Sequence, residues 1–349
     1  MIQKAKEFAF SLIYKSIDRL PLAYLQKLLD KIFDKIEEKE NKYITWHKRP
    51  KNAESVRITA DAVVDLSGTW IVMQGPLVRE DDFTLQTLKL YRSFFKDVKI
   101  ILSLWNDEDK NYLESHRECY DILLLNAKPT QKGHHNINMQ IESAGMGVKR
   151  ACEENAKYIM RTRTDQRIYN PNCFNYFISL LNLFPETPKP DVNRLVVTNM
   201  YTLKFRPFGI SDMLMFGYAK DVNTYWNIPW DKRSQIDLTK AKTVYDFADK
   251  RICETYLATE YLTKVGSKWS IDLAESWKSY KDYFIIIDAQ SIDLFWIKYD
   301  RRTEYRFDYY DCYHSYQVAK MSDWLPRVLN NNTRVEFSLE TLEGQPASK

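Results

Sequence analysis

Apolar residues recur with a helical period in the first part of the chain, and short apolar runs alternate with helical patterns in the rest. This change in pattern divides the chain into two parts. Between residues 2 and 20, apolar side chains recur at steps of three and four, with basic residues on the remaining positions. Pro21 interrupts this pattern, which resumes over 22–36 and ends in a charged run. The sequence therefore predicts an N-terminal pair of amphipathic helices over 1–45.

This helical pair suits two roles. A basic amphipathic helix can lie on a membrane surface, whereas an apolar helical face also packs against a catalytic domain or a second subunit. Four acidic residues weaken attraction to anionic lipid because they nearly cancel the basic charges: Glu7, Asp18, Asp30 and Asp34. Packing against protein is favoured, and peripheral membrane contact or a homodimer through residues 1–40 stays open.

From about residue 68, short apolar runs alternate with amphipathic helical patterns, which is typical of an α/β domain with a mostly parallel sheet flanked by helices. Strands are expected at 70–73, 98–105, 121–125, 157–163, 194–198, 212–217 and 283–287. Helices are expected at 84–95, 107–115, 136–154, 174–184, 221–226 and 252–265. The resulting division is a linker over 46–67, a catalytic domain over 68–330 and a polar tail over 331–349.

Composition excludes several classes of protein. Apolar residues make up 44% and charged residues 28%, which is near the globular average and argues against disorder. The net charge of +4 is small and both signs are interspersed, so nucleic acid is not an expected partner. The 5 cysteines form no metal-binding or redox motif. With no long apolar run and no cleavable leader, a cytoplasmic protein is expected.

Ligands of open parallel sheets bind beyond the carboxyl ends of the strands. This rule selects Gln74-Gly75-Pro76, the turn after Trp105, the loop entering the helix at Asn136, and the segment 164–167. Gly75 permits close approach of a ligand to the backbone, and Trp105 offers a ring for stacking on a base.

The densest polar cluster lies around the fourth expected strand. Period-two alternation sends Arg161, Arg163 and Asp165 to one side of the chain. Two guanidinium groups suit a diphosphate, and a carboxylate at a strand end can hold a divalent cation or a ribose hydroxyl. The alternative is an edge strand carrying a solvated row of charges.

Several short motifs together resemble a known family. They are Asn136-x-Asn138-x-Gln140-Ile141-x-Ser143-x-x-x-Gly147, Arg163-Thr164-Asp165, and Phe208-x-x-Ser211-Asp212-x-x-x-Phe216-Gly217, with Gln74-Gly75-Pro76 and Glu254-x-Tyr256-Leu257. This combination, over about 68–300, resembles the WavE family of lipopolysaccharide and capsule synthesis proteins. Members of that family are similar to GT-A glycosyltransferases, so the resemblance implies a GT-A-like (Rossmann-like) domain that uses a nucleotide sugar.

One departure from the GT-A pattern concerns the metal. Such enzymes commonly carry Asp-x-Asp at this turn, whereas this chain has Asp165-Gln166-Arg167. A single Asp165 can still hold Mg²⁺ or Mn²⁺ together with donor phosphates and water, because these ions take few protein ligands. Alternatively, Arg167 offsets the charge on the departing nucleotide. A metal at Asp165 is slightly favoured.

Sugar transfer also needs a base for the acceptor hydroxyl, and Asp212 and Glu254 are the candidates. Each has a structural alternative, because Asp212 suits a turn and Glu254 suits the first turn of a helix. Asn136, Asn138 and Gln140 are assigned to hydrogen bonds with the nucleotide, although Asn136 also suits a helix cap.

These assignments predict a glycosyltransferase that moves a sugar from a nucleotide-sugar donor to a surface glycan of capsule or lipopolysaccharide type. The acceptor is an oligosaccharide or a lipid-linked glycan, which places the enzyme at the inner face of the cytoplasmic membrane. Two alternatives are another nucleotide-dependent transferase acting on glycans, and a non-catalytic polysaccharide assembly protein.

Overall fold

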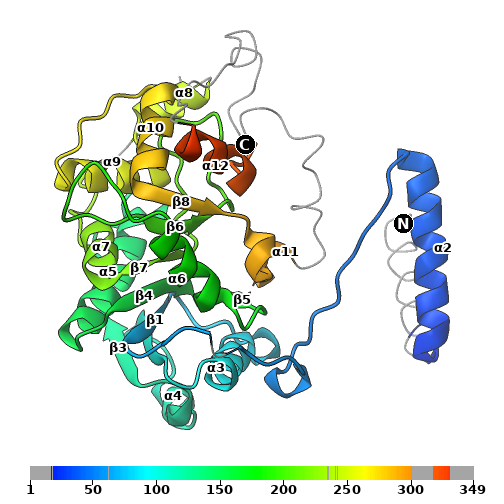
Figure 1. Ribbon diagram of the computed structural model, residues 1–349. Coiled ribbons are helices and arrows are strands. Elements are labelled where there is room, and N and C mark those ends of the chain that lie inside the picture. Colours follow the sequence, from blue (N-terminus) through cyan, green and yellow to red (C-terminus); the bar gives the residue numbers. More distant parts are fainter. Residues whose placement is uncertain are drawn as a thin grey trace. The chain divides into compact units, whose positions relative to one another are not determined.

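A computed structural model describes residues 17, 19–61, 63–233, 236–239, 241, 243–300 and 317–330 (Figure 1). The chain divides into two compact units, 1–50 and 51–349, and each is described by itself. Most of the expected helix over 2–20 and the whole expected tail over 331–349 lie outside the described residues.

The first unit contains the second helix of the expected N-terminal pair, α2 (Leu22–Glu40). Asn41 ends it in a left-handed conformation, with its N–H bonded to the carbonyl of Glu37. The ring of Trp46 packs against Phe33 at 6.0 Å between centroids. Large apolar side chains remain exposed on this helix, namely Leu22, Tyr24, Leu28 and Ile32. None of the helices in the described residues is both long and apolar enough to cross a membrane.

The described part of the second unit is built on a seven-stranded sheet in the order β3-β2-β1-β4-β7-β6-β8 (Figure 1). Its strands are β1 (Thr69–Gln74), β2 (Lys99–Trp105), β3 (Ile122–Asn126), β4 (Tyr158–Arg163), β6 (Leu195–Thr198), β7 (Met215–Tyr218) and β8 (Phe284–Ile287). All neighbouring pairs are parallel except those of β7, which runs antiparallel to β4 and β6. The expected mostly parallel, Rossmann-like sheet is confirmed, and it is consistent with a GT-A-like fold.

Helices cover both faces of this sheet. The larger ones are α3 (Phe83–Phe94), α5 (Ile137–Glu153), α6 (Cys173–Leu183), α7 (Ala219–Trp226), α9 (Glu254–Lys264), α10 (Leu273–Tyr283) and α12 (Met321–Leu329), and the short ones are α4 (Lys110–Glu114), α8 (Val244–Asp249) and α11 (Ile297–Asp300). The register places Val72 of β1 beside Arg161 of β4 on one face of the sheet. Helices α5 and α7 pack on this face, where Gly147 of α5 lies against Val72 and Trp226 of α7 stacks on Arg161. The opposite face carries Phe216, whose ring contacts α6.

Several features of the structure differ from the expectations. The strand expected at 212–217 begins at Met215, so Asp212 lies in the preceding loop, and the helix expected at 107–115 shortens to α4. The ribbon of β5 (Gln166–Ile168) and β9 (Leu294–Trp296) was not expected. Helices α8, α10 and α12 were not expected either, because polar residues dilute their apolar pattern. Part of the expected linker packs on the domain, since Ala53 N–H donates to Gln86 Oε1 at 2.9 Å.

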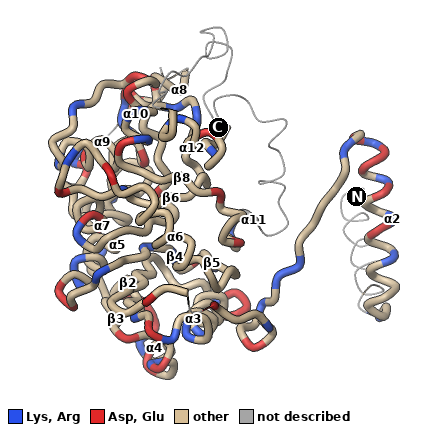
Figure 2. The backbone as a smooth tube through the Cα atoms, in the orientation of Figure 1, with Lys and Arg blue, Asp and Glu red and all other residues tan. Residues whose placement is uncertain are grey.

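Charges of both signs are interspersed along the described part of the chain (Figure 2). The sheet interior is apolar, and the core residues of β1 and β4, such as Ile71 and Ile159, are fully buried. Arg161 of β4 is a charged exception, since it is also fully buried.

Gly147 is expected to be essential to the packing of α5 on the sheet. A Cβ at this position would lie 2.5 Å from Val72 Cγ1 and 3.2 Å from Ser103 Cβ, so Gly147→Ala forces the helix away from β1 and β2. We expect the free energy of unfolding to fall by about 1–3 kcal/mol in urea unfolding. Met146→Ala, at an exposed position of the same helix, is the control and should change little. An unchanged or raised stability in Gly147→Ala would contradict this packing, because alanine by itself favours the helix.

Candidate active site

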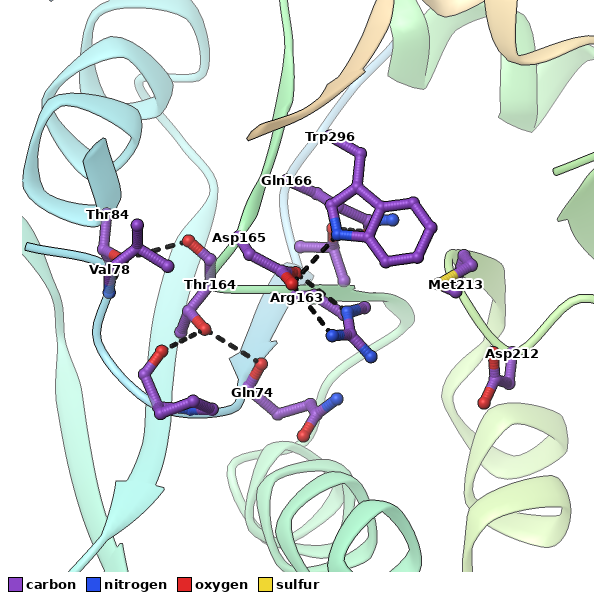
Figure 3. A network of polar contacts seen from close by, with 12 residues as sticks. Gln74, Val78, Thr84, Arg163, Thr164, Asp165, Gln166, Asp212, Met213 and Trp296 are labelled. Carbon is purple, nitrogen blue, oxygen red and sulfur yellow. Dashed lines mark hydrogen bonds and ion pairs between the residues drawn. The ribbon is translucent and has the colours of Figure 1, made fainter. Parts of the chain in front are cut away.

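The site lies where β1 and β4 end side by side. These strands are parallel, and their register pairs Gln74 with Arg163, so both side chains lie on the face that α5 covers. Gly75 follows with φ +120°, and a Cβ there would lie 2.9 Å from Thr164 Oγ1. The Thr164 hydroxyl donates to the carbonyl of Pro76 at 2.6 Å (Figure 3). The expected Gln74-Gly75-Pro76 turn is thus tied directly to the turn after β4.

Asp165 is held from two directions. Arg163 donates from Nε to Oδ1 at 2.8 Å and from Nη2 to Oδ2 at 2.9 Å, forming a bidentate ion pair. Trp296, on β9, donates from Nε1 to Oδ2 at 2.9 Å (Figure 3). Burial raises the pKa of Asp165, but the hydrogen bonds from Arg163 and Trp296 outweigh burial and hold the pKa below its ordinary value.

Arg167 does not line the site. Its side chain is 1% exposed and its guanidinium group stacks on Phe83, with 4.4 Å between the Cζ atom and the ring centroid. It donates to Thr87 Oγ1 at 2.9 Å, to the Tyr169 hydroxyl at 3.1 Å and to the carbonyl of Lys51 at 2.7 Å. The alternative in which Arg167 offsets charge on a leaving nucleotide is therefore wrong for this conformation, because β5 turns the side chain into the core.

Arg161 lies on the same face as Arg163 but deeper. It is fully buried, donates to the carbonyl of Asp212 and lies 4.1 Å from the ring centroid of Trp226. Burial lowers the pKa of its guanidinium group, and the charge of Asp212 acts in the opposite direction. The charge of Arg163 lowers this pKa further, whereas that of Asp165 raises it.

The two expected bases come together in the same region. Asp212 is 3% exposed, and its Oδ1 is buried without a hydrogen-bond partner among the described residues. Glu254 is the first residue of α9 and forms an ion pair with Arg206, with 2.9 Å between Oε2 and Nη2. Burial raises the pKa of Glu254, Arg206 lowers it, and the nearby charge of Asp212 raises it further. Each of these acidic residues therefore has an arginine beside it: Arg161 at the carbonyl of Asp212 and Arg206 at the side chain of Glu254.

Sequence reasoning missed Arg206 and the strained backbone around Glu254. Three non-glycine residues near it have positive φ, namely Phe208 (55°), Arg251 (47°) and Cys253 (45°). Such conformations cost of order 1–3 kcal/mol each and cluster at functional sites, where the surrounding structure holds them. The sequence carried no signal for them because none of the three is glycine.

The residues assigned to the nucleoside divide into two groups. Gln74 Oε1 accepts a hydrogen bond from Ser143 of α5 at 2.5 Å, and Gln140 lies one helical turn before Ser143 with its Oε1 buried and without a partner in the described residues. Gln74, directly before Gly75, is thus tied to the helix that carries Gln140.

The other members of this set lie elsewhere or are engaged. Asn138 is fully buried, donates to the carbonyls of Gln131 and Asp231, and accepts from Asp231 N–H at 2.7 Å, so it holds a loop. Trp105 is 5% exposed and offers little ring surface for stacking. Asn136 is exposed at the N-terminus of α5, where its side chain makes no capping hydrogen bond.

The donor set at Asp165 does not fit a divalent cation well. The described residues contain no group of three or more His, Cys, Asp or Glu side chains that could hold a metal ion. Asp165 is the single carboxylate at its turn, and both of its oxygens already accept hydrogen bonds. Arg167, in the position of the second acidic ligand, is built into the core.

The depressed pKa of Asp165 makes a prediction about stability. Because the folded pKa lies below the ordinary value of 3.8, the ionised carboxylate stabilises the fold above that pH, and this contribution is lost as the pH falls through the folded pKa. We expect Asp165→Asn to cost about 1.5–3 kcal/mol in urea unfolding near neutral pH, and less below about pH 4. Asp97→Asn, at an exposed position, serves as control. A cost that does not change with pH would contradict the ion pair.

Comparison with known proteins gives remote structural likenesses and a family match. No curated protein matches the chain significantly. Three solved structures show remote similarity. A mannose-1-phosphate geranyltransferase from Thermus thermophilus is 13% identical over 37% of this chain and 40% of that chain, with a TM-score of 0.24. A glycosyltransferase involved in glycosylation of the major capsid of PBCV-1 is 12% identical over 63% and 81%, with a TM-score of 0.31. A cytidylyltransferase from Leptospira borgpetersenii is 9% identical over 83% and 98%, with a TM-score of 0.34.

A family match carries more weight than these likenesses. The model of the family described as WavE lipopolysaccharide synthesis matches residues 69–285, which is more than half of the chain and includes Gln74, Asp165, Asp212 and Glu254. The chain therefore belongs to the WavE lipopolysaccharide synthesis family.

Proposed function

We propose that this protein is a glycosyltransferase that transfers a sugar from a nucleotide-sugar donor to a surface glycan. Family membership supports a role in lipopolysaccharide synthesis. The observation that carries the proposal is the meeting of two groups of side chains. The Arg163–Asp165 ion pair adjoins the glycine turn after β1, and Arg161, two residues earlier on the same face of β4, contacts the backbone of Asp212, whose charge reaches Glu254.

The donor is proposed to lie over the ends of β1 and β4. Gly75 has no side chain, so the phosphates or ribose can approach its backbone closely. Any larger residue at this position would meet Thr164. Arg163 binds the diphosphate, while Asp165 has further lone pairs with which it accepts a ribose hydroxyl. Gln74 and Gln140 contribute amide groups to the nucleoside.

Transfer requires the acceptor oxygen to form a bond to the anomeric carbon as the bond from that carbon to the diphosphate oxygen breaks. The bonding electrons stay on the departing diphosphate, where Arg163 stabilises the charge and the buried Arg161 adds to the positive field. The hydroxyl proton passes to a carboxylate, either Asp212 or Glu254. A base performs best when its pKa lies closer to the working pH, and the raised pKa of Glu254 meets this requirement.

The acceptor is proposed to be an oligosaccharide or lipid-linked glycan of lipopolysaccharide or capsule type, met at the inner face of the cytoplasmic membrane. In the first unit, the exposed apolar residues of α2 support either peripheral membrane contact or a homodimer through this helix.

The donor site is tested first by binding and transfer. We expect Asp165→Ala to abolish the rise in melting temperature that the donor produces, and to lower transfer by about 100-fold or more, because Arg163 loses the partner that orients it. Mass spectrometry of products with a panel of nucleotide sugars measures the transfer, and it also separates sugar transfer from transfer of another group. Asp97→Ala is the control at an exposed aspartate. If Asp165→Ala leaves both binding and turnover unchanged, the proposed site is wrong.

The base is tested by the pH dependence of kcat. Asp212→Asn and Glu254→Gln should each leave the donor-induced rise in melting temperature in place. The variant that removes the base should lower kcat by about 10²–10⁴-fold. Because the pKa of Glu254 is raised above 4.5, its action as base predicts a rate that increases with pH through an apparent pKa above that value. Glu254→Gln should abolish this limb. A limb retained in Glu254→Gln but lost in Asp212→Asn assigns the base to Asp212.

A further inference from the structure

The turn after β4 holds Asp165 in a fixed pair with Arg163, and Arg167 stands where a second carboxylate would be expected. We propose that the donor diphosphate is bound without a divalent cation, by the guanidinium group of Arg163, and that Asp165 is the positioning residue that orients this arginine. This inference rests on the proposed function and specifies how the same site neutralises its donor.

The first support is the occupancy of Asp165. Its two oxygens accept three hydrogen bonds, two from the fork of Arg163 and one from Trp296, and only 14% of the side chain is exposed. Bidentate arginine–carboxylate pairs are among the strongest hydrogen-bonded contacts in proteins. Three of its roughly four lone-pair sites are thus in use, and a cation at the remaining site would lie beside the positively charged guanidinium group of Arg163.

The second support is the nature of the neighbouring charges. Each remaining carboxylate of the site has an arginine beside it, since Arg161 contacts the backbone of Asp212 and is affected by its charge, and Arg206 pairs with Glu254. With Arg163 beside Asp165, each of the three acidic residues of the site is accompanied by an arginine. A cation placed at one of these carboxylates would be repelled by the neighbouring guanidinium group, and this repulsion is strong in a partly buried site.

The third support is the geometry that arginine offers to phosphate. A guanidinium group is permanently charged and planar, and it binds phosphate oxygens through two parallel hydrogen bonds. Arg163 is 20% exposed, so it reaches the surface of the site, and its register partner is Gln74 at the glycine turn. The indole of Trp296 lies 5.5 Å from the Arg163 Cζ atom and limits the movement of the side chain.

Arg167 explains why the acidic pattern at this turn is reduced to one residue. In this fold the position two residues after Asp165 does not face the site, because it belongs to β5, and its side chain lies in the core against Phe83. Four groups now accept hydrogen bonds from the guanidinium group of Arg167. A carboxylate buried among these acceptors would be unfavourable. Restoring an Asp-x-Asp pattern by substitution would therefore not create a metal site.

The test is calorimetric titration of the full-length protein with the nucleotide sugar that gives the largest rise in melting temperature. Titrations are made in EDTA, in Mg²⁺ and in Mn²⁺. We expect Kd values that agree within about threefold in all three conditions, corresponding to less than about 0.7 kcal/mol. Binding that weakens by about tenfold or more in EDTA overturns the inference.

Variants distinguish the two roles of the pair. Arg163→Gln should weaken binding by about tenfold or more equally with and without Mn²⁺, with Arg163→Lys intermediate because lysine keeps the charge but loses the fork. Asp165→Asn retains an oxygen that accepts from Arg163, so a smaller loss, again equal in both conditions, is expected. Arg150→Gln removes a surface arginine paired with Glu154 and should leave Kd unchanged.

A direct measurement of the metal completes the design. Electron paramagnetic resonance of Mn²⁺ should show no ion bound to the protein and its donor beyond what the donor binds in buffer. A bound ion that disappears in Asp165→Asn shows Asp165 to be a metal ligand and overturns the inference while the proposed function stands. If no nucleotide sugar binds under any condition, the proposed function itself fails.

Discussion

The structure of the site depends on the ion pair between Arg163 and Asp165. Two partly buried charges of opposite sign are stable only when each is well matched, because removing either partner leaves an uncompensated charge away from water. The fold supplies this match from three places. The register of β1 with β4 sets Gln74 beside Arg163, the bond from Thr164 to Pro76 fixes the turn, and the β5–β9 ribbon brings Trp296 to Oδ2 of Asp165.

The wider site extends this matching of charges. Arg161 contacts the backbone of Asp212 and Arg206 pairs with Glu254, so each acidic residue of the site has an arginine beside it. Such groups are already oriented before substrate arrives, and a site of this kind stabilises a developing charge without reorganising. Orienting these groups has a conformational cost in the backbone, since Cys253, immediately before Glu254, has a positive φ. Membership of the WavE lipopolysaccharide synthesis family supports a transferase of glycan synthesis.

Local periodicity predicts much of this arrangement. The sheet strands, α5 and the shared side of Arg161 and Arg163 follow from apolar runs and from period-two alternation, which act over a few residues. The inward turn of Arg167 does not follow, because β5 is three residues long and its partner β9 comes much later in the chain. The same limit applies to the pairing of Arg206 with Glu254. Asn138 is similar, since its amide binds the distant backbone of Asp231, and the sequence alone favoured a nucleotide contact.

The central claim is that a nucleotide sugar binds where β1 and β4 end. Hydrogen–deuterium exchange, compared with and without the bound donor, tests it most directly because it reports on each backbone segment separately. The account predicts slower exchange in peptides that cover 74–78 and 163–168, with no change in α2. Donor binding that leaves both of these segments unchanged, and slows exchange at another part of the chain instead, would contradict it.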